Sequence, residues 1–263
     1  MGKYLLVLKN SMQRSLVYRF NTFAVLIFQV FTFLMFFYLW SSIYRGGQQI
    51  GTYDMKGIIT YYLLAIFLGM VIKSNDMAWR VGDEIRLGSI TNYLLKPVNY
   101  FWFKIFGALG DVVYKFLIYT SSIVIIFLFF KDHFAISFDL ERTIYFLAFV
   151  FLGLMIHLMF FYLVGISAFW FGFIFGFNFS MQMIVNFLSG SLLPLDLLPE
   201  IIVKIGDFLP FKYIMYVPIL VFNGRIELTP GLFIVPLAWI FIFYILSVIM
   251  FKKGIKKYEG YGA

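Results

Sequence analysis

Cysteine is absent from the 263 residues, and this excludes disulfide bonds, thiol nucleophiles and cysteine-ligated metal sites. Only two histidines occur, His133 and His157, so a histidine-rich metal site is not expected either. Charged residues make up 13% of the chain, whereas a soluble domain carries about 25%. This shortage argues against a soluble protein, and the formal charge of +8 is therefore not taken as a sign of nucleic-acid binding.

Several catalytic motifs are missing as well. The sequence contains no G-x-x-x-x-G-K-S/T phosphate loop, no H-E-x-x-H and no G-x-S-x-G. It also shows no internal repeat of the kind that marks an inverted-repeat secondary transporter. We therefore expect a chain that is not an enzyme and that holds no metal and no cofactor of its own.

Apolar residues are present in large excess. They account for 62% of the chain, and phenylalanine alone occurs 36 times. A helix that crosses the hydrocarbon core needs about 20 mostly apolar residues. We therefore expect an all-α polytopic membrane protein with one transmembrane domain over residues 1–263. The six expected spans cover residues 21–44, 57–75, 105–130, 142–168, 176–195 and 231–251.

Lysine and arginine are concentrated on one side of these spans. They cluster before the first span, between the second and third, and after the sixth, and basic flanks of this kind face the cytoplasm. Both termini are therefore expected in the cytoplasm. Within residues 1–20, Leu5, Leu8, Met12 and Leu16 recur at helical spacing, largely opposite the polar side chains. This pattern predicts an amphipathic helix in the cytoplasmic interface.

The expected cytoplasmic loop 76–104 contains an unusual stretch, GDEIRLGSITNYLLKPVNY (Gly82–Tyr100). Apolar and charged residues interleave in it, Ser89 follows Gly88 as a candidate helix cap, and Pro97 is expected to stop the helix. We predict two short helical pieces with one face on the spans and one face toward the cytoplasm. Two interpretations remain open, a contact surface for a cytoplasmic partner and a solvated elbow without one.

A second irregular region precedes the last span. Between Leu188 and Pro230 the chain is too apolar for a free loop and is broken by five prolines: Pro194, Pro199, Pro210, Pro218 and Pro230. We expect residues 196–230 to form short re-entrant helices on the outer side. They would serve as an outer cap or gate, or alternatively as an interfacial anchor.

A few polar residues fall inside the expected spans. Lys104, Ala108, Asp111 and Lys115 form one stripe on the third span. Charges in a membrane usually face protein or water, so Asp111 and Lys115 fit either proton or substrate handling or a structural ion pair. His157 lies alone in the fourth span, and there an interhelical hydrogen bond and a proton relay are the two alternatives.

Taken in order, these parts resemble the permease subunit of a type-two ABC transporter. Three stretches are similar to an exporter-like subfamily whose permeases occur in pairs beside a separate ATPase. They are EIRLGSITNYLLKPVNY at Glu84–Tyr100, SGSLLPLDLLP with LPFKYIMYVP within Ser189–Pro218, and GIKKYEGYG at Gly254–Gly262. The resemblance covers essentially the whole chain, although its motifs consist of pattern and position without invariant catalytic residues.

The resemblance implies how such a protein would work. The ATPase would be a separate chain that carries ATP and magnesium, and a second permease chain would complete the pathway through the cell membrane. Residues 82–97 would form the coupling segment. Asp83, Glu84 and Arg86 would be its charged contacts, Ser89 and Pro97 would shape it, and Tyr93 and Leu94 would tie it to the spans.

The function expected on this basis is ATP-driven export of an amphipathic or hydrophobic substrate by alternating access. The substrate path itself cannot be assigned to residues. The alternative is a proton-coupled secondary transporter that uses Asp111, Lys115 or His157.

Overall fold

The computed structural model describes residues 2–17, 19–46, 50–72, 77–136 and 138–258. Helices dominate these residues, and they contain no β-strand, only an isolated bridge between Ile50 and Tyr53. The predicted all-α class is therefore confirmed. The predicted end of the second span (residue 75) lies outside the described residues, and so does the end of the stretch Gly254–Gly262.

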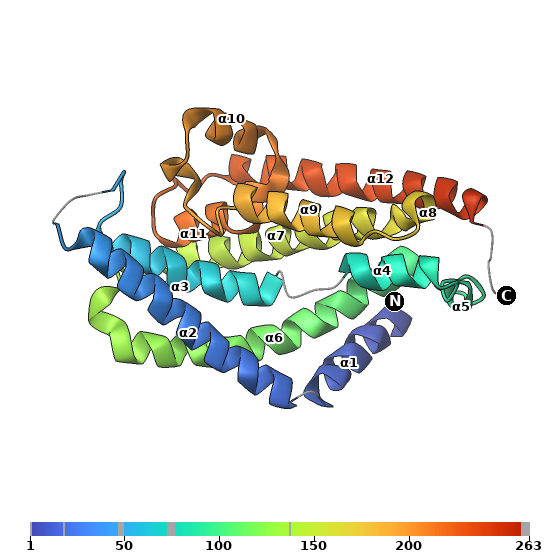
Figure 1. The fold of residues 1–263 in the computed structure, drawn as a ribbon, viewed down its shortest axis with the longest axis horizontal. Coiled ribbons are helices and arrows are strands. Elements are labelled where there is room, and N and C mark those ends of the chain that lie inside the picture. Colours follow the sequence, from blue (N-terminus) through green and yellow to red (C-terminus); the bar gives the residue numbers. More distant parts are fainter. Residues whose placement is uncertain (1, 18, 47–49, 73–76, 137, 259–263) are drawn as a thin grey trace.

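Long and short helices follow one another in groups along the chain (Figure 1). The long ones are α2 (Arg19–Tyr44), α3 (Met55–Ile72), α6 (Tyr100–Phe130), α7 (Leu140–Ile166) and α12 (Ile234–Lys257). The shorter ones are α1 (Gly2–Val17), α4 (Met77–Arg86), α5 (Thr91–Leu94), α8 (Ala168–Phe171), α9 (Phe175–Leu188), α10 (Glu200–Phe208) and α11 (Tyr216–Phe222). Short 3-10 turns are η1 (Lys131–His133), η2 (Leu195–Leu197), η3 (Pro210–Ile214) and η4 (Pro230–Phe233).

In the described part of the chain, five helical stretches, built on α2, α3, α6, α7 and α12, are long and apolar enough to cross a membrane. The chain is thus a multi-pass membrane protein. The expected fifth span, 176–195, corresponds to α9, which has 14 residues. At about 1.5 Å per residue α9 falls short of the ~30 Å hydrocarbon core. The count of six spans stays a prediction.

Two long helices begin earlier than the predicted spans because their N-termini are capped. The side chain of Asn99 accepts a hydrogen bond from the Trp102 amide (3.2 Å), so α6 begins at Tyr100. Asp139 accepts one from the Glu141 amide (3.0 Å) at the start of α7. Side-chain oxygens at these positions satisfy amides that have no partner within the helix. Residues 100–104, expected in the loop, therefore belong to a helix.

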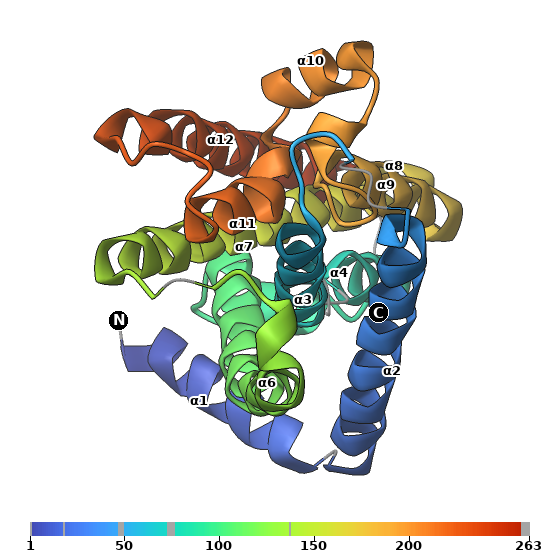
Figure 2. The same ribbon diagram turned by 90° about the vertical axis from the view of Figure 1, so that its left-hand side faces the viewer.

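The centre of the bundle is formed by α3 and α7, whereas α2 and α12 expose most of their apolar side chains (Figure 2). Exposed leucine, isoleucine and phenylalanine on long helices are expected where lipid is the solvent. Close packing fixes α1 along α6, because a Cβ added at Gly110 would collide with the Leu8 carbonyl oxygen.

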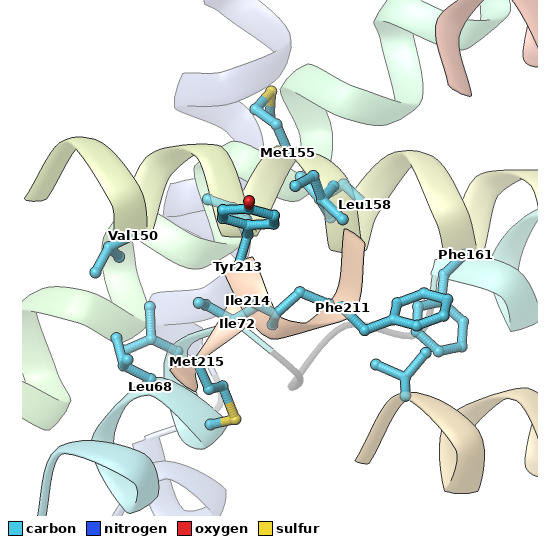
Figure 3. Packing of buried hydrophobic residues seen from close by; sticks show 14 of the residues in the cluster. Leu68, Ile72, Val150, Met155, Leu158, Phe161, Phe211, Tyr213, Ile214 and Met215 are labelled. Atoms are coloured by element: carbon cyan, nitrogen blue, oxygen red, sulfur yellow. The ribbon is translucent and has the colours of Figure 1, made fainter. Parts of the chain in front are cut away.

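The proline-rich region forms short helices that begin at or just after prolines, as at Pro210 and Pro230. The η3 turn packs against the middle of α7, where a Cβ on Gly153 would lie 2.5 Å from the Tyr213 carbonyl oxygen. Ile214 and Met215 are fully buried there, near Leu68 of α3 (Figure 3). The irregular backbone is thus shielded by protein, as membrane depth would require. Its entry into the bilayer stays a prediction.

Candidate functional site

The stretch Gly82–Tyr100 folds into two short helices joined by a tight turn. The turn is at Gly88, whose φ of +80° lies in the left-handed region that glycine adopts without strain. The Thr91 hydroxyl donates to the Gly88 carbonyl oxygen at 2.8 Å. The proposed cap was wrong: Ser89 does not cap α5, which follows Ile90 without a side-chain cap. The chain turns through backbone hydrogen bonds instead, among them Ile90 amide to Glu84 carbonyl at 3.0 Å.

The apolar face of α4 packs tightly on α7. Val81 and Ala78 are buried, and a Cβ on Gly165 would lie 2.7 Å from the Val81 Cβ. A Cβ on Gly82 would lie 2.6 Å from the end of the Ile174 side chain, in the turn before α9. Small residues on both sides therefore bring the helices close, as is typical of packing inside membrane proteins.

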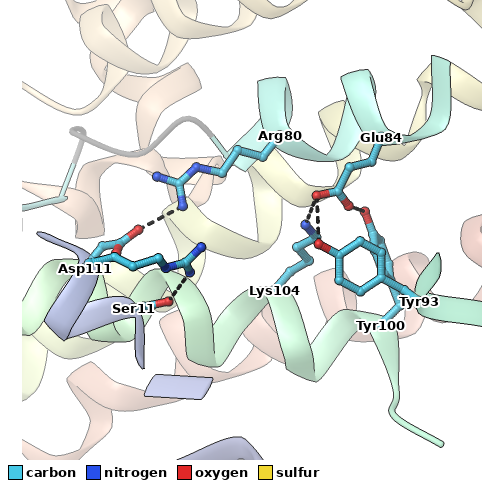
Figure 4. A network of polar contacts seen from close by, with 8 residues as sticks. Ser11, Arg80, Glu84, Tyr93, Tyr100, Lys104 and Asp111 are labelled. Carbon is cyan, nitrogen blue, oxygen red and sulfur yellow. Dashed lines mark hydrogen bonds and ion pairs between the residues drawn. The ribbon is translucent and has the colours of Figure 1, made fainter. Parts of the chain in front are cut away.

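A neighbouring face of α4 carries Glu84, whose carboxylate lies among three side chains that we call the Glu84 cluster: Tyr93, Tyr100 and Lys104 (Figure 4). Tyr100 donates to it at 2.7 Å and Tyr93 at 3.4 Å. The Lys104 ammonium forms an ion pair with the same carboxylate and lies 4.8 Å from the centre of the Tyr93 ring. The Lys104 and Glu84 side chains are 9% and 19% exposed, so the pair is largely shielded from water.

The cluster has a consequence for Tyr93. Burial raises the pKa of its hydroxyl, and the neighbouring Glu84 carboxylate raises the pKa further, because both disfavour the phenolate. Tyr93 therefore stays protonated and keeps donating to Glu84.

A second ion pair joins the same two helices one turn away. Arg80 of α4 donates to Asp111 of α6 at 2.9 Å, with side-chain exposures of 51% and 15% (Figure 4). On α4 the arginine precedes the glutamate, and on α6 the lysine precedes the aspartate. The two helices run in opposite directions (Figure 1). Because the order of charges is the same on both helices, each cation faces an anion.

The remaining predicted charged contacts, Asp83 and Arg86, are partly exposed, and the Arg86 guanidinium lies 5.4 Å from the centre of the Phe173 ring. Asp83 and Arg86 pair with each other at 3.1 Å and are about equally exposed, at 43% and 42%. Leu94 is exposed although it was expected to tie the segment to the spans, because α5 is a single turn and Tyr93 occupies its inward side. A surface pocket of about 510 Å³ is lined by Ser89, Asn92, Tyr93, Leu95 and Lys96.

The N-terminal helix also holds this region. The Lys3 ammonium donates to the Pro97 carbonyl oxygen at 2.6 Å, and the Tyr4 hydroxyl accepts from the Asn99 amide at 3.0 Å. Pro97 thus follows the end of α5, as expected, and its carbonyl oxygen links α1 to the segment.

The three polar residues expected inside the spans lie on two helices, Asp111 and Lys115 on α6 and His157 on α7. Asp111 lies at the α4–α6 contact with Arg80, and Lys115 follows one turn later on α6. His157 is buried on α7 beside Phe161, with the ring centres 4.6 Å apart. Within the residues that the structure describes, no three histidine, aspartate or glutamate side chains gather closely enough to hold a metal ion.

Sequence reasoning overlooked Arg80 and Tyr100 and treated Lys104 only as a member of a stripe. A signal was present: Arg80 and Glu84 are one turn apart, and Lys104 and Asp111 are two turns apart. Charges at these intervals lie on one face of each helix. Pairing them required knowing that α4 and α6 lie side by side.

A different polar cluster lies toward the opposite end of the long axis (Figure 1). We call Thr52, Tyr53, Asp196 and Arg225 the Tyr53 cluster. Tyr53 donates to Asp196 at 3.1 Å, and Arg225 donates to the hydroxyl and the carbonyl oxygen of Thr52 at 2.9 and 3.0 Å. The Arg225 guanidinium lies 3.7 Å from the centre of the Tyr53 ring. These contacts join the α2–α3 loop to the region expected as the outer cap.

Comparison with known proteins agrees with this architecture. The model of the ABC-2 family transporter protein matches residues 26–262, which is nearly the whole chain. No curated protein and no solved structure matches it significantly. The apolar helix bundle and the match over almost its full length lead to one conclusion: the chain belongs to the ABC-2 transporter family, as the permease subunit of a type-two ABC transporter.

Proposed function

We propose that this permease works with a separate ATPase chain that docks on residues 82–97. The observation that carries the proposal is a preformed elbow, α4–α5, that is tied to the bundle on its inner side and exposes charge and leucine on the other. Leu87 and Leu95 are exposed beside Asp83 and Arg86. Leucines that meet water at the tip of an ordered segment fit a protein contact better than a solvated loop.

ATP and magnesium would be bound by the ATPase, and ATP binding would move the elbow toward or away from the spans. The inner ends of the helices would then rearrange, and the pathway would open alternately to either side. On family likeness the direction is export, and the aromatic spans suit an amphipathic or hydrophobic substrate. The basic flanks of the spans support placement in the cell membrane with both termini in the cytoplasm.

A second permease chain is part of the proposal. One chain presents one elbow and therefore addresses one ATPase, whereas closure of an ATPase dimer needs two. The weakly buried α2 and the largely exposed α9 leave apolar surface for a second copy or a related chain. The expected complex is a dimer of permease chains, homomeric or heteromeric, with a pair of ATPase chains.

The complex can be tested by expressing the chain together with the genes that flank it. Native mass spectrometry of the purified membrane complex should show permease and ATPase in equal numbers. Transport by inverted vesicles should need ATP and should survive collapse of the proton gradient. A stable single permease without ATPase would contradict the proposal. Transport that follows the proton gradient without nucleotide would favour the secondary transporter.

That alternative is not favoured. The family match places the chain among ABC transporters, which use ATP.

A further inference from the structure

Two ion pairs join α4 and α6: Arg80 with Asp111, and Glu84 with Lys104. They bear on how a movement of α4 would be passed to the spans. The α4 helix is held on two sides by different kinds of contact. Against α7 it has close steric contact through Val81 and Gly165, and against α6 it has the two ion pairs. Packed side chains resist separation as well as approach, because separation loses their dispersion contacts. The two ion pairs add directional contacts between named atoms, and these tie α4 to α6.

The pairs also connect the elbow to more than one element. Glu84 contacts Tyr93 of α5 and Tyr100 and Lys104 of α6, so the beginning, the middle and the end of residues 84–104 meet at one carboxylate. The α1 helix packs along α6, with Ser11 fully buried beside Gly107 and Gly110. A displacement of α4–α5 would therefore carry α6, and α1 with it.

We propose that Arg80, Glu84, Lys104 and Asp111 are positioning residues that force α6 to follow the elbow when the ATPase moves it. The inference rests on the proposed function, and it assigns Glu84 to the spans and not to the ATPase contact. Asp83 and Arg86, on the other face of α4, remain for the ATPase. The inner and outer faces of the elbow thus have separate tasks.

The decisive experiment measures movement of α6 in the complex of permease and ATPase. The chain has no cysteine, so spin labels at Leu117→Cys on α6 and Leu147→Cys on α7 are the only labels on each permease chain that carries them. Both positions are exposed. The distance between the labels is measured without nucleotide and after trapping with ATP and vanadate. The native chain should show a nucleotide-dependent change in this distance.

Glu84→Gln combined with Arg80→Gln removes one charged partner of each pair; glutamine keeps the length of glutamate and is shorter than arginine by two atoms. We expect the ATPase to co-purify in native amount, but the nucleotide-dependent change and the permease-dependent ATPase rate should each fall about threefold or more. The thermal unfolding midpoint is recorded for each variant. A purely structural role would lower the midpoint and leave the distance change per folded complex intact, which would overturn the proposal.

Charge exchange tests the pairing itself and protects against misfolding of the neutral variant. Glu84→Lys with Lys104→Glu, and separately Arg80→Asp with Asp111→Arg, should restore most of the distance change that each single reversal abolishes. The matched control is Glu200→Gln with Lys204→Gln, which removes an exposed ion pair of 2.7 Å on α10 and should change neither readout.

The outcomes separate the inference from the proposed function. If the neutral variant moves α6 as the native chain does, or if it loses the ATPase, the positioning role is wrong while the ATPase partnership stands. If the native chain neither binds nor responds to an ATPase, the proposed function fails and the inference fails with it.

Discussion

The two polar clusters at opposite ends of the molecule are built from different chemistry. The Glu84 cluster joins helices through full charges that are largely buried, with Lys104 9% exposed. The Tyr53 cluster joins loops through the Tyr53 hydroxyl, the Arg225 guanidinium and one exposed carboxylate, Asp196. Nearby tyrosines add contacts to backbone carbonyl oxygens, as Tyr62 does to Leu192 at 2.7 Å. The Glu84 cluster therefore connects helices, and the Tyr53 cluster holds the region expected as the outer cap.

The difference bears on how each end responds when a partner is lost. Removing one member of a buried ion pair leaves a charge without compensation in a medium of low dielectric constant. Removing the Tyr53 hydroxyl leaves the Asp196 carboxylate, which is exposed and can be solvated by water. We therefore expect the α4–α6 contact to behave as an all-or-none connection and the Tyr53 cluster to weaken gradually.

The largest effect is expected at Lys104. Lys104→Met leaves the Glu84 carboxylate with the tyrosine hydroxyls alone and should destabilise the chain by about 3 kcal/mol, the lower end for a buried pair because Glu84 is 19% exposed. The measurement is denaturant unfolding of the permease in detergent. Adding Glu84→Gln should recover most of the loss. A double variant as unstable as Lys104→Met alone would show that the charge pair is not the cause.

Close packing at the same end should come next. Gly165→Ala places a Cβ 2.7 Å from that of Val81, and such overpacking costs about 1–3 kcal/mol. Gly176→Ala is the matched control, because nothing lies within 4 Å of the added Cβ. The same unfolding measurement applies. Equal stability of the two variants would mean that α4 and α7 separate easily, contrary to the close packing described for Val81 and Gly165.

Comparison of these residues with the sequence shows what could be predicted. Gly88 and Pro97 mark the ends of the short helices by their own backbone preferences, so the two-piece elbow was predictable. Ser89 was misjudged as a cap, because the turn closes through backbone hydrogen bonds that leave its side chain unused for that purpose. The role of Glu84 depends on the register between α4 and α6, and no local pattern encodes that register.

The length of α9 illustrates the same limit. The run of apolar residues from Phe177 to Leu193 satisfies the composition of a span, yet the helix stops at Leu188 and the chain continues as turns. The turn after α9 is fixed from two sides: the Tyr61 hydroxyl of α3 donates to the Gly190 carbonyl oxygen at 2.5 Å, and the Tyr216 amide of the cap region donates to the Ser189 carbonyl oxygen at 3.0 Å. Long-range contacts of this kind override composition, and hydropathy cannot reveal them.

At the other end, Tyr53→Phe should cost about 1 kcal/mol, the usual net value of one hydrogen bond. Tyr53 is fully buried, whereas Tyr38 on α2 is 66% exposed, so Tyr38→Phe is the control. The effect should be local. Hydrogen exchange at the Tyr216 amide, which donates to the Ser189 carbonyl oxygen at 3.0 Å, should accelerate while α4 stays protected. Acceleration at both ends would mean that the clusters are coupled and that the contrast drawn between them is wrong.

The smallest effect on stability is expected on the outward face of the elbow. Asp83 and Arg86 are a half-exposed pair on one helix, and such pairs contribute about 0.2–0.5 kcal/mol. Asp83→Asn with Arg86→Gln should therefore leave unfolding nearly unchanged. The proposed ATPase contact should nevertheless weaken, because both side chains are partly exposed on the elbow that is expected to meet the partner. Binding of the ATPase to the permease in nanodiscs, titrated at low and high salt, measures this directly. Native affinity in the variant would remove Asp83 and Arg86 from the contact, whereas reduced affinity at unchanged stability would separate the two faces of α4 by function.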